Sequence, residues 1–162
     1  MLRPRNFAFL LLGMASGAAA QQQSLGIFGL WGAFAGNGRC HAISQPERAA
    51  QGGARGAFAS VAFWPQRGLR GQAYFRLSQP KREGSALILR IDERTFQLRG
   101  GGVQAWAPDA TADAAIVAAM RTGILMTLDT RSASGSLVRD SYRLRGAATA
   151  IDAAAIACAR RG

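Results

Sequence analysis

Residues 147–160 of this chain read AATAIDAAAIACAR and have the pattern of an amphipathic helix. Its small and apolar side chains fall at helical spacing on one face, namely Ala147, Ile151, Ala154, Ala155 and Cys158. Arg160 and Arg161 suit the negative end of a helix dipole. We therefore expect a C-terminal helix whose buried stripe includes Cys158.

The chain has two cysteines, Cys40 and Cys158, and both follow a secretory leader. Thiols delivered to an oxidising compartment tend to pair. We predict a Cys40–Cys158 disulfide that ties an early strand to the last helix. In the chain-entropy model, closing so long a loop stabilises a fold by roughly 4–5 kcal/mol.

The leader occupies residues 1–20 and has the three parts of a signal peptide. Arg3 and Arg5 are basic, residues 7–16 (FAFLLLGMAS) are apolar, and residues 18–20 are small alanines of the kind that signal peptidase reads. A membrane span needs about 20 apolar residues, more than this run provides. We expect cleavage after Ala20, a periplasmic or secreted protein, and no integral membrane anchor.

After the leader, we expect a flexible mature N-terminus at residues 21–27 and a single domain at residues 28–162. The full sequence has 20 Lys+Arg against 9 Asp+Glu, a net charge of +11, and without the leader the charge is +9. Positive charge favours anionic partners. For an exported protein these would be an anionic glycolipid or lipid surface, or an envelope or host protein, rather than nucleic acid. A solvated, arginine-rich surface without a partner is the alternative.

Short apolar or alternating runs separated by turn residues predict many strands before the last helix. The expected strands are residues 28–34, 39–44, 57–64, 72–78, 86–91, 95–99, 103–107, 124–129 and 137–144. A helix is expected at residues 108–123, with Thr111 as its cap. The order predicts an α+β fold, mainly antiparallel β, built as a small open barrel or sandwich with one internal helix and a C-terminal helix.

Short motifs recur in a fixed order along the chain. They are AWA (105–107), AAMRTG (118–123), SASG (132–135), DSYRLRG (140–146) and AC (157–158). Together with the opening Trp31…Arg39-Cys40-His41 and the central hairpin of Ile91, Asp92, Phe96 and Leu98, the chain resembles the invasion-associated locus B family of exported alphaproteobacterial proteins. The resemblance implies a periplasmic or envelope protein with a small β-rich domain. It implies no catalytic residue, and the family's name is not a mechanism.

A catalytic site would have to use His41, the single histidine of the chain. Its possible partners are Ser132, Ser134, Ser136, Asp129 and Asp140, but no G-x-S-x-G elbow surrounds any of these serines. One histidine and two distant cysteines make no recognisable zinc set. The glycine run 100–102 lacks the Gly-Lys-Ser/Thr of a phosphate loop. We expect no catalytic residue, metal or cofactor.

The tryptophans offer a different kind of site. We expect Trp31 and Trp106 to pack in the core, whereas Trp64 precedes Pro65 at a strand end and is followed by Arg67. A basic, aromatic-tipped binding patch is predicted from these residues and neighbouring loops, composed of Trp64, Arg67, Arg70, Lys81 and Arg82. This interpretation makes the protein a non-enzymatic binding protein. The alternatives are a periplasmic hydrolase inhibitor and a weak hydrolase that uses His41.

Overall fold

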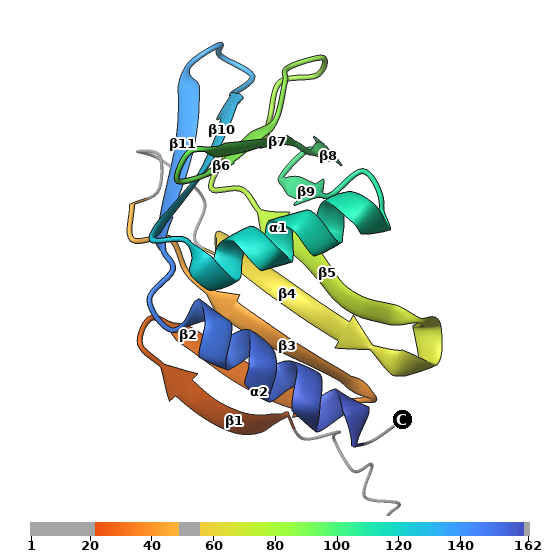
Figure 1. The fold of residues 1–162 in the computed structure, drawn as a ribbon. Helices are drawn as coiled ribbons and strands as arrows, with labels where there is room; N and C mark the ends of the chain where they lie inside the picture. The colour runs from red at the N-terminus through yellow and green to blue at the C-terminus, as the bar shows by residue number, and fades with distance from the viewer. Residues whose placement is uncertain (1–21, 49–55, 161–162) are drawn as a thin grey trace, which may run out of the picture.

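The computed structural model describes residues 22–48 and 56–160 (Figure 1). The signal peptide predicted for residues 1–20 lies outside this part of the chain. The elements in order are β1 (Gln23–Phe28), β2 (Trp31–Gly36), β3 (Arg39–Ser44), β4 (Phe58–Trp64), the 3-10 turn η1 (Pro65–Arg67), β5 (Leu69–Arg76), β6 (Ile88–Ile91), β7 (Arg94–Gln97), β8 (Arg99–Gly101), β9 (Gln104–Trp106), α1 (Ala110–Thr122), β10 (Leu125–Arg131), β11 (Leu137–Arg143) and α2 (Ala147–Ala159).

The strands form two antiparallel sheets. The larger has the order β1-β2-β3-β4-β5-β9-β8, and the smaller has the order β11-β10-β6-β7. Short turns join β1 to β2, β2 to β3 and β4 to β5, and residues 45–57 join β3 to β4. Consecutive strands are neighbours throughout, so strand order follows chain order from β1 to β5. The predicted α+β fold with mainly antiparallel sheet, one internal helix and one C-terminal helix is confirmed.

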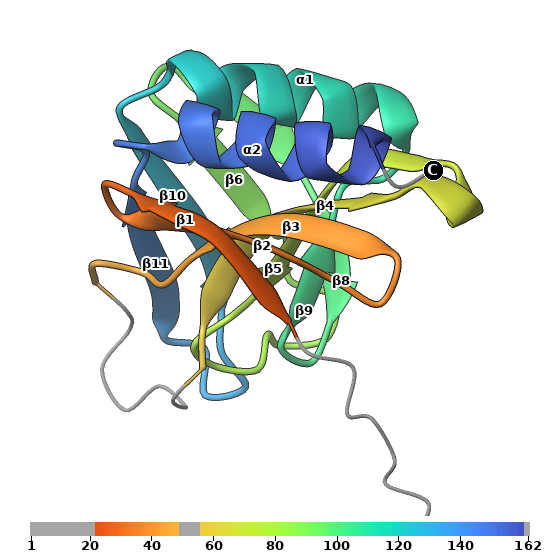
Figure 2. The same cartoon turned by 90° about the horizontal axis from the view of Figure 1, so that it is seen from below.

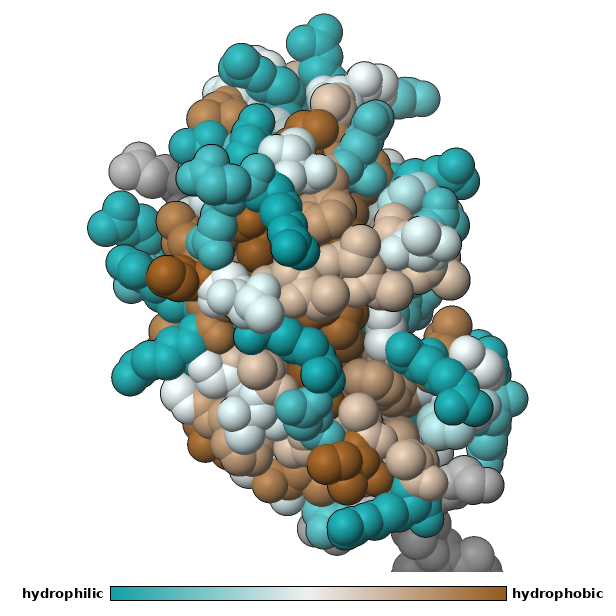
Figure 3. Space-filling view, in the orientation of Figure 1, coloured by the Kyte–Doolittle hydropathy of each residue, from teal (hydrophilic) through white to brown (hydrophobic). Residues whose placement is uncertain are grey.

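Both helices lie on the same face of the larger sheet (Figures 1 and 2). α2 contacts β1 to β4, α1 contacts β5, and Arg121 of α1 forms an ion pair with Asp152 of α2. Figure 3, drawn from the helix side, shows hydrophilic side chains between the two helices. In the part of the chain that the structure describes, no helix covers the opposite face of the larger sheet (Figure 2).

Alternation along the strands directs small side chains toward the helices. Ala33 and Ala35 of β2, Ala59 and Val61 of β4, and Ala73 and Phe75 of β5 are fully buried. Small residues let a helix approach a sheet closely, and α2 in turn presents mostly alanine. Trp31 fills the core beside them, and its Nε1–H donates a hydrogen bond to the carbonyl oxygen of Arg143 at 3.0 Å.

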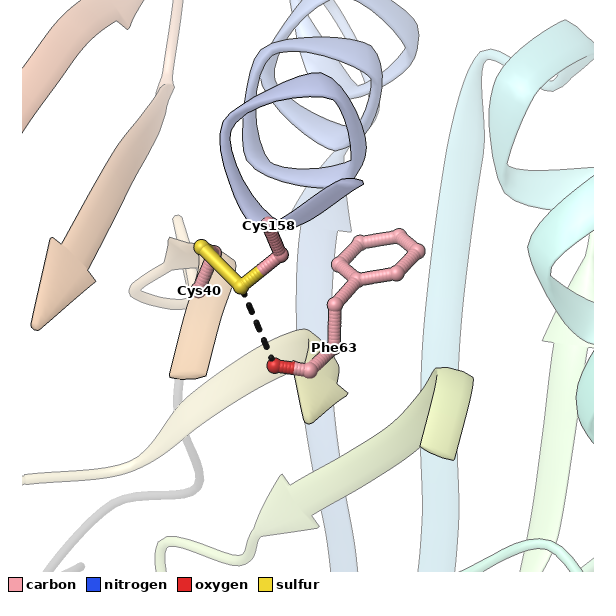
Figure 4. The surroundings of a disulfide bond; sticks show 3 residues. All are labelled: Cys40, Phe63 and Cys158. Atoms are coloured by element: carbon pink, nitrogen blue, oxygen red, sulfur yellow. Dashed lines mark hydrogen bonds between the residues drawn. A yellow bond between two sulfur atoms is a disulfide. The ribbon is translucent and has the colours of Figure 1, made fainter. Parts of the chain in front are cut away.

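The predicted disulfide is present (Figure 4). It joins Cys40 of β3 to Cys158 of α2 across 118 residues of sequence, with their Cα atoms 5.7 Å apart. Cys40 is fully buried and Cys158 is 2% exposed. The Sγ atom of Cys158 also lies 3.6 Å from the carbonyl oxygen of Phe63 in β4. The bridge therefore fastens the last helix to the middle of the larger sheet.

Two segments differ from their predicted structure. Residues 23–27, expected to be flexible, form the edge strand β1 together with Phe28, and a turn at Gly29 and Leu30 divides the strand predicted at 28–34. The glycine-rich β8 also pairs, with β9. Its Gly100 is required there, because a Cβ atom would lie 2.1 Å from the carbonyl oxygen of Gln104. In both segments pairing with a neighbouring strand outweighs weak intrinsic β propensity.

Two residue roles were predicted wrongly. Asp109, not Thr111, caps α1, because its Oδ1 accepts a hydrogen bond from the N–H of Ala112 at 2.8 Å. Trp106 was expected in the core but is 37% exposed. In β9, Ala105 is the residue that turns toward the helices, so Trp106 faces the other way.

Across residues 22–48 and 56–160, neither helix is long and apolar enough to cross a membrane.

Candidate binding site

The helix-free face of the larger sheet carries a row of outward-pointing side chains. Cys40 and Ala42 of β3 face α2. Because side chains alternate along a strand, Arg39, His41 and Ile43 face away from it. The strand register continues this row, since Ile43 lies opposite Ser60, Ser60 opposite Tyr74, and Tyr74 opposite Trp106. Polar, aromatic and basic side chains thus gather on a surface that neither helix covers.

A hollow of about 410 Å³ lies on this face, across β3, β4 and β5. We name it the Trp64 hollow. Its aromatic walls come from Phe58, Trp64 and Tyr74, and its basic side chains are Arg39 and Arg67. No aspartate or glutamate is among the described residues that line it. The volume of the hollow falls in the range of small-molecule binding sites. Such sites are usually lined by apolar side chains with a few polar groups, as this hollow is.

Both arginines of the hollow make cation–π contacts with Trp64. The guanidinium carbon of Arg67 lies 3.9 Å from the centre of the Trp64 ring, and that of Arg39 lies 5.9 Å from it. Neither arginine forms a salt bridge within residues 22–48 and 56–160. Cation–π contact positions a guanidinium without neutralising its charge. Both charges are therefore available to an anionic ligand.

His41 lies beside Arg39 on the outer face of β3 and against Phe34 of β2. Its ring stacks on that of Phe34, with centroids 5.7 Å apart, and its Nε2 lies 3.2 Å from Nε2 of Gln22. Burial, and then the positive charge of Arg39, lower the pKa of His41 from 6.5. The imidazole is consequently neutral at pH 7, and a nearby anion would favour its protonation.

The structure brings together two members of the predicted five-residue patch. Trp64 and Arg67 are in contact, but Arg70 lines a separate hollow on the helix side with Ala155 of α2. Lys81 and Arg82 lie beyond the opposite end of β5, where their N–H groups donate to the carbonyl oxygens of Gly102 and Arg131. The loops before and after β5 are close in sequence but lie at opposite ends of this strand. Arg67 is therefore far from Lys81 and Arg82.

The predicted patch lacked most of the residues that line the hollow, among them Arg39, His41, Phe58 and Tyr74. A signal for the first two existed in the sequence. Once Cys40 is assigned to the buried face of its strand, alternation places Arg39 and His41 on the opposite face. Nothing in the sequence indicated that this face would be left uncovered.

The residues considered for hydrolysis are not assembled around His41. Ser132, Ser134 and Ser136 form a hydrogen-bonded chain at the β10–β11 turn. Asp129 binds Arg90 at 2.5 Å and Arg139 at 2.6 Å. All of these lie on the smaller sheet or its turn, whereas His41 belongs to β3 of the larger one.

Asp140 forms buried hydrogen bonds that stabilise the fold. It is fully buried, and its two carboxylate oxygens accept hydrogen bonds from the N–H of Ser78 at 2.8 Å and the hydroxyl of Ser78 at 2.5 Å. Burial, and then the charge of Asp140, raise the pKa of Tyr142 far above its usual value. This cluster connects the end of β5 to the smaller sheet and is closed to solvent.

The described residues also offer no metal site. Within them, no three His, Cys, Asp or Glu side chains lie close enough together to hold an ion.

Comparisons with known proteins support the fold. The chain matches no protein-family model and no curated protein by sequence. Its structure is similar to the crystal structure of invasion associated protein B from Bartonella henselae, with a TM-score of 0.62. The alignment covers 85% of this chain and 99% of that chain, at 18% sequence identity. The chain therefore has the fold of that protein, in agreement with the fold implied by the sequence motifs.

Proposed function

We propose that the protein is an exported, envelope-associated binding protein of the invasion-associated locus B type, without catalytic activity. The observation that carries the proposal is the Trp64 hollow, where two arginines free of salt bridges within the described residues border an aromatic cavity without an acidic wall. Its ligand is an anionic component of the envelope. The predicted leader, the buried disulfide and the fold shared with invasion associated protein B support export.

The surroundings of His41 favour binding over hydrolysis. Ser60 lines the same hollow, but its hydroxyl donates to the carbonyl oxygen of Tyr74 at 3.3 Å rather than to the imidazole. A catalytic serine needs a base within hydrogen-bond reach and a carboxylate that orients it. His41 instead stacks on Phe34 and lines the same hollow as two arginines, an environment that suits an anion.

The test is sedimentation of the protein with vesicles of phosphatidylglycerol and phosphatidylcholine, compared with vesicles of phosphatidylcholine alone. Binding to the anionic vesicles should fall steeply between roughly 0.05 and 0.5 M NaCl, because screening weakens attraction between exposed charges. Arg67→Glu should weaken binding at least tenfold. Arg82→Glu makes the same change of charge away from the hollow and serves as the matched control.

Two results would overturn the proposal. One is binding that neither salt nor Arg67→Glu alters. The other is an equal loss of binding in Arg67→Glu and Arg82→Glu, because this would assign the attraction to net charge rather than to the hollow.

Inhibition of a periplasmic hydrolase is a second candidate. The turn η1 supports it, because hollows lie on both faces of the β4–β5 hairpin, with Trp64 and Arg67 on one side and Gln66 and Arg70 on the other. Figure 1 shows this hairpin end extending past the helices. An inhibitor would insert such a turn into an active site. Assay of periplasmic hydrolases with the wild-type protein and with Pro65→Gly tests this role, and an inhibition that the turn variant retains would contradict it.

A further inference from the structure

A second hollow adjoins the Trp64 hollow on the helix-free face. It measures about 520 Å³ and lies over β1, β2 and the end of β3. We name it the Ile27 hollow. Its apolar wall is made by Ile27, Leu30, Phe34, Ile43 and Pro46.

The two hollows are continuous in their lining. Ile43 belongs to both, and Phe34 of the Ile27 hollow stacks on His41 of the Trp64 hollow. Gly32 forms part of the floor. A Cβ atom there would lie 2.7 Å from the Phe34 ring and 3.1 Å from Cδ1 of Ile27, so both side chains lie directly over the strand. The lining crosses β1 to β5, which at strand spacings of about 4.8 Å gives a path of roughly 19 Å.

The two ends of this path differ in charge. At the Trp64 end, Arg39 and Arg67 have no carboxylate partner in the described part of the chain. At the other end Arg143 is paired with Glu47 at 3.0 Å. Large apolar side chains are also exposed at this end, with Ile27 68% and Leu30 46% accessible. The surface therefore has two arginines without a carboxylate partner at one end, and at the other it has exposed apolar side chains beside an ion pair, with Arg145 adjoining Leu30.

We propose that the two hollows form one groove for an anionic amphiphile with a single acyl chain. The headgroup binds between Arg39 and Arg67, and the chain runs over Ile43 toward Ile27 and Leu30. This inference rests on the proposed function and specifies the class of its ligand. Charge complementarity selects the anionic headgroup, and the exposed apolar end selects the acyl chain, since burying it removes apolar surface from water.

A free anion or an acidic glycan would use the groove differently. Either would be attracted to Arg39 and Arg67 but would leave the Ile27 hollow exposed to water. The dependence of affinity on chain length therefore separates the amphiphile from these ligands. Each methylene that is fully buried should strengthen binding about fourfold.

The experiment titrates the oxidised protein with hexyl, octyl, decyl and dodecyl phosphate below their micelle concentrations, with inorganic phosphate as the headgroup alone. Binding is followed by calorimetry. Affinity should rise between twofold and fourfold for each added methylene, the upper value being that of complete burial. Dodecyl maltoside, which has the same chain without the charge, should bind at least tenfold more weakly than dodecyl phosphate.

Two variants locate the chain within the groove. Ile27→Ser with Leu30→Ser should remove most of the gain from octyl to dodecyl phosphate while leaving the affinity for hexyl phosphate unchanged. Leu137→Ser is the matched control, because Leu137 is 52% exposed on β11 and lies outside both hollows. Arg67→Glu should weaken all four alkyl phosphates by a similar factor.

The outcomes separate this inference from the proposed function. If inorganic phosphate and all alkyl phosphates bind equally and Arg67→Glu weakens each of them, the anion site stands and the acyl groove is wrong. Chain-length dependence that Ile27→Ser with Leu30→Ser leaves intact would also contradict the groove. If no anionic ligand binds the wild-type protein better than it binds Arg67→Glu, the proposed function fails and the groove fails with it.

Discussion

A Cβ atom on Gly146 would lie 1.7 Å from the carbonyl oxygen of Phe28. Gly146, the N-cap residue of α2, thus lies directly against the end of β1. Its φ is +94°, a backbone conformation that residues other than glycine rarely adopt. The neighbouring hydrogen bond from the N–H of Leu30 to the carbonyl oxygen of Arg145, 3.1 Å long, belongs to the same junction. The last helix and the first hairpin are therefore positioned against each other by backbone contacts at this junction.

We expect Gly146→Ala to lower the free energy of unfolding by more than about 3 kcal/mol, because the methyl group must displace backbone rather than a flexible side chain. Urea unfolding followed by circular dichroism measures the change. Gly84→Ala is the matched control, since Gly84 has a φ of +72° but no atom within 4 Å of its Cβ position. That variant should cost only about 1–2 kcal/mol. Equal losses for the two variants would show that conformation alone, and not the contact with Phe28, matters.

Removing the disulfide should destabilise the protein strongly. Cys40→Ser with Cys158→Ser opens a loop that spans 118 residues, for which the chain-entropy model gives a loss of about 4–5 kcal/mol. Urea unfolding of the oxidised protein and of the double variant tests the value. A loss below about 1 kcal/mol would show that the unfolded chain is already compact without the bridge.

The stability of the protein should depend on the protonation of His41. Because the pKa of His41 is lowered from 6.5 in the folded state, the unfolded chain binds this proton more readily. The free energy of unfolding should therefore fall as the pH drops below 6.5 and should level off below the lowered pKa. His41→Gln removes this contribution.

The measurement is urea unfolding of the wild-type protein and of His41→Gln at about pH 8 and about pH 5, values that lie on either side of an ordinary histidine pKa. The wild-type protein should lose more stability between them than the variant does. Identical losses would place His41 in a solvent environment and contradict the lowered pKa.

Two substitutions in the buried cluster around Asp140 should change the stability of the protein by different amounts. The hydroxyl of Tyr142 is buried without a hydrogen-bond partner among the described residues, so Tyr142→Phe should leave stability within about 1 kcal/mol of wild type or increase it. Ser78→Ala removes a hydrogen bond to a buried carboxylate and should cost about 1.5–3 kcal/mol. Thermal unfolding of both variants tests the pair. A larger loss for Tyr142→Phe than for Ser78→Ala would contradict this account of the cluster.

The sequence predicted the parts of the fold that depend on local pattern. Alternation in β5 correctly directed Ala73 and Phe75 into the core, and the apolar stripe of the last helix correctly included Cys158. β1 was not predicted because its sequence, QSLGIF, has no regular alternation. Its register with β2 shifts between Ser24 and Gly26, and only its pairing with β2 makes it a strand.

The candidate site was only partly predictable for a related reason. The contact between Trp64 and Arg67 joins residues three positions apart, and the sequence indicated it. Arg39 and Tyr74 reach the same hollow through the register of β3, β4 and β5, which depends on tertiary pairing. Exposure of Trp106 depends on which sheet face the helices leave open, and strand alternation alone does not decide between two faces.

The disulfide also determines how the protein would carry mechanical load. A pull applied to the two ends of the chain passes from Cys40 directly to Cys158 through the covalent bridge. β4 to β11 and helix α1 all lie inside that closed loop and would bear none of the tension. In the described part of the chain, the loaded path contains β1, β2, the start of β3 and Ala159, the last residue of α2. Under force the oxidised protein should therefore yield a short extension from its first hairpin, and the strands that form most of the Trp64 hollow should remain folded.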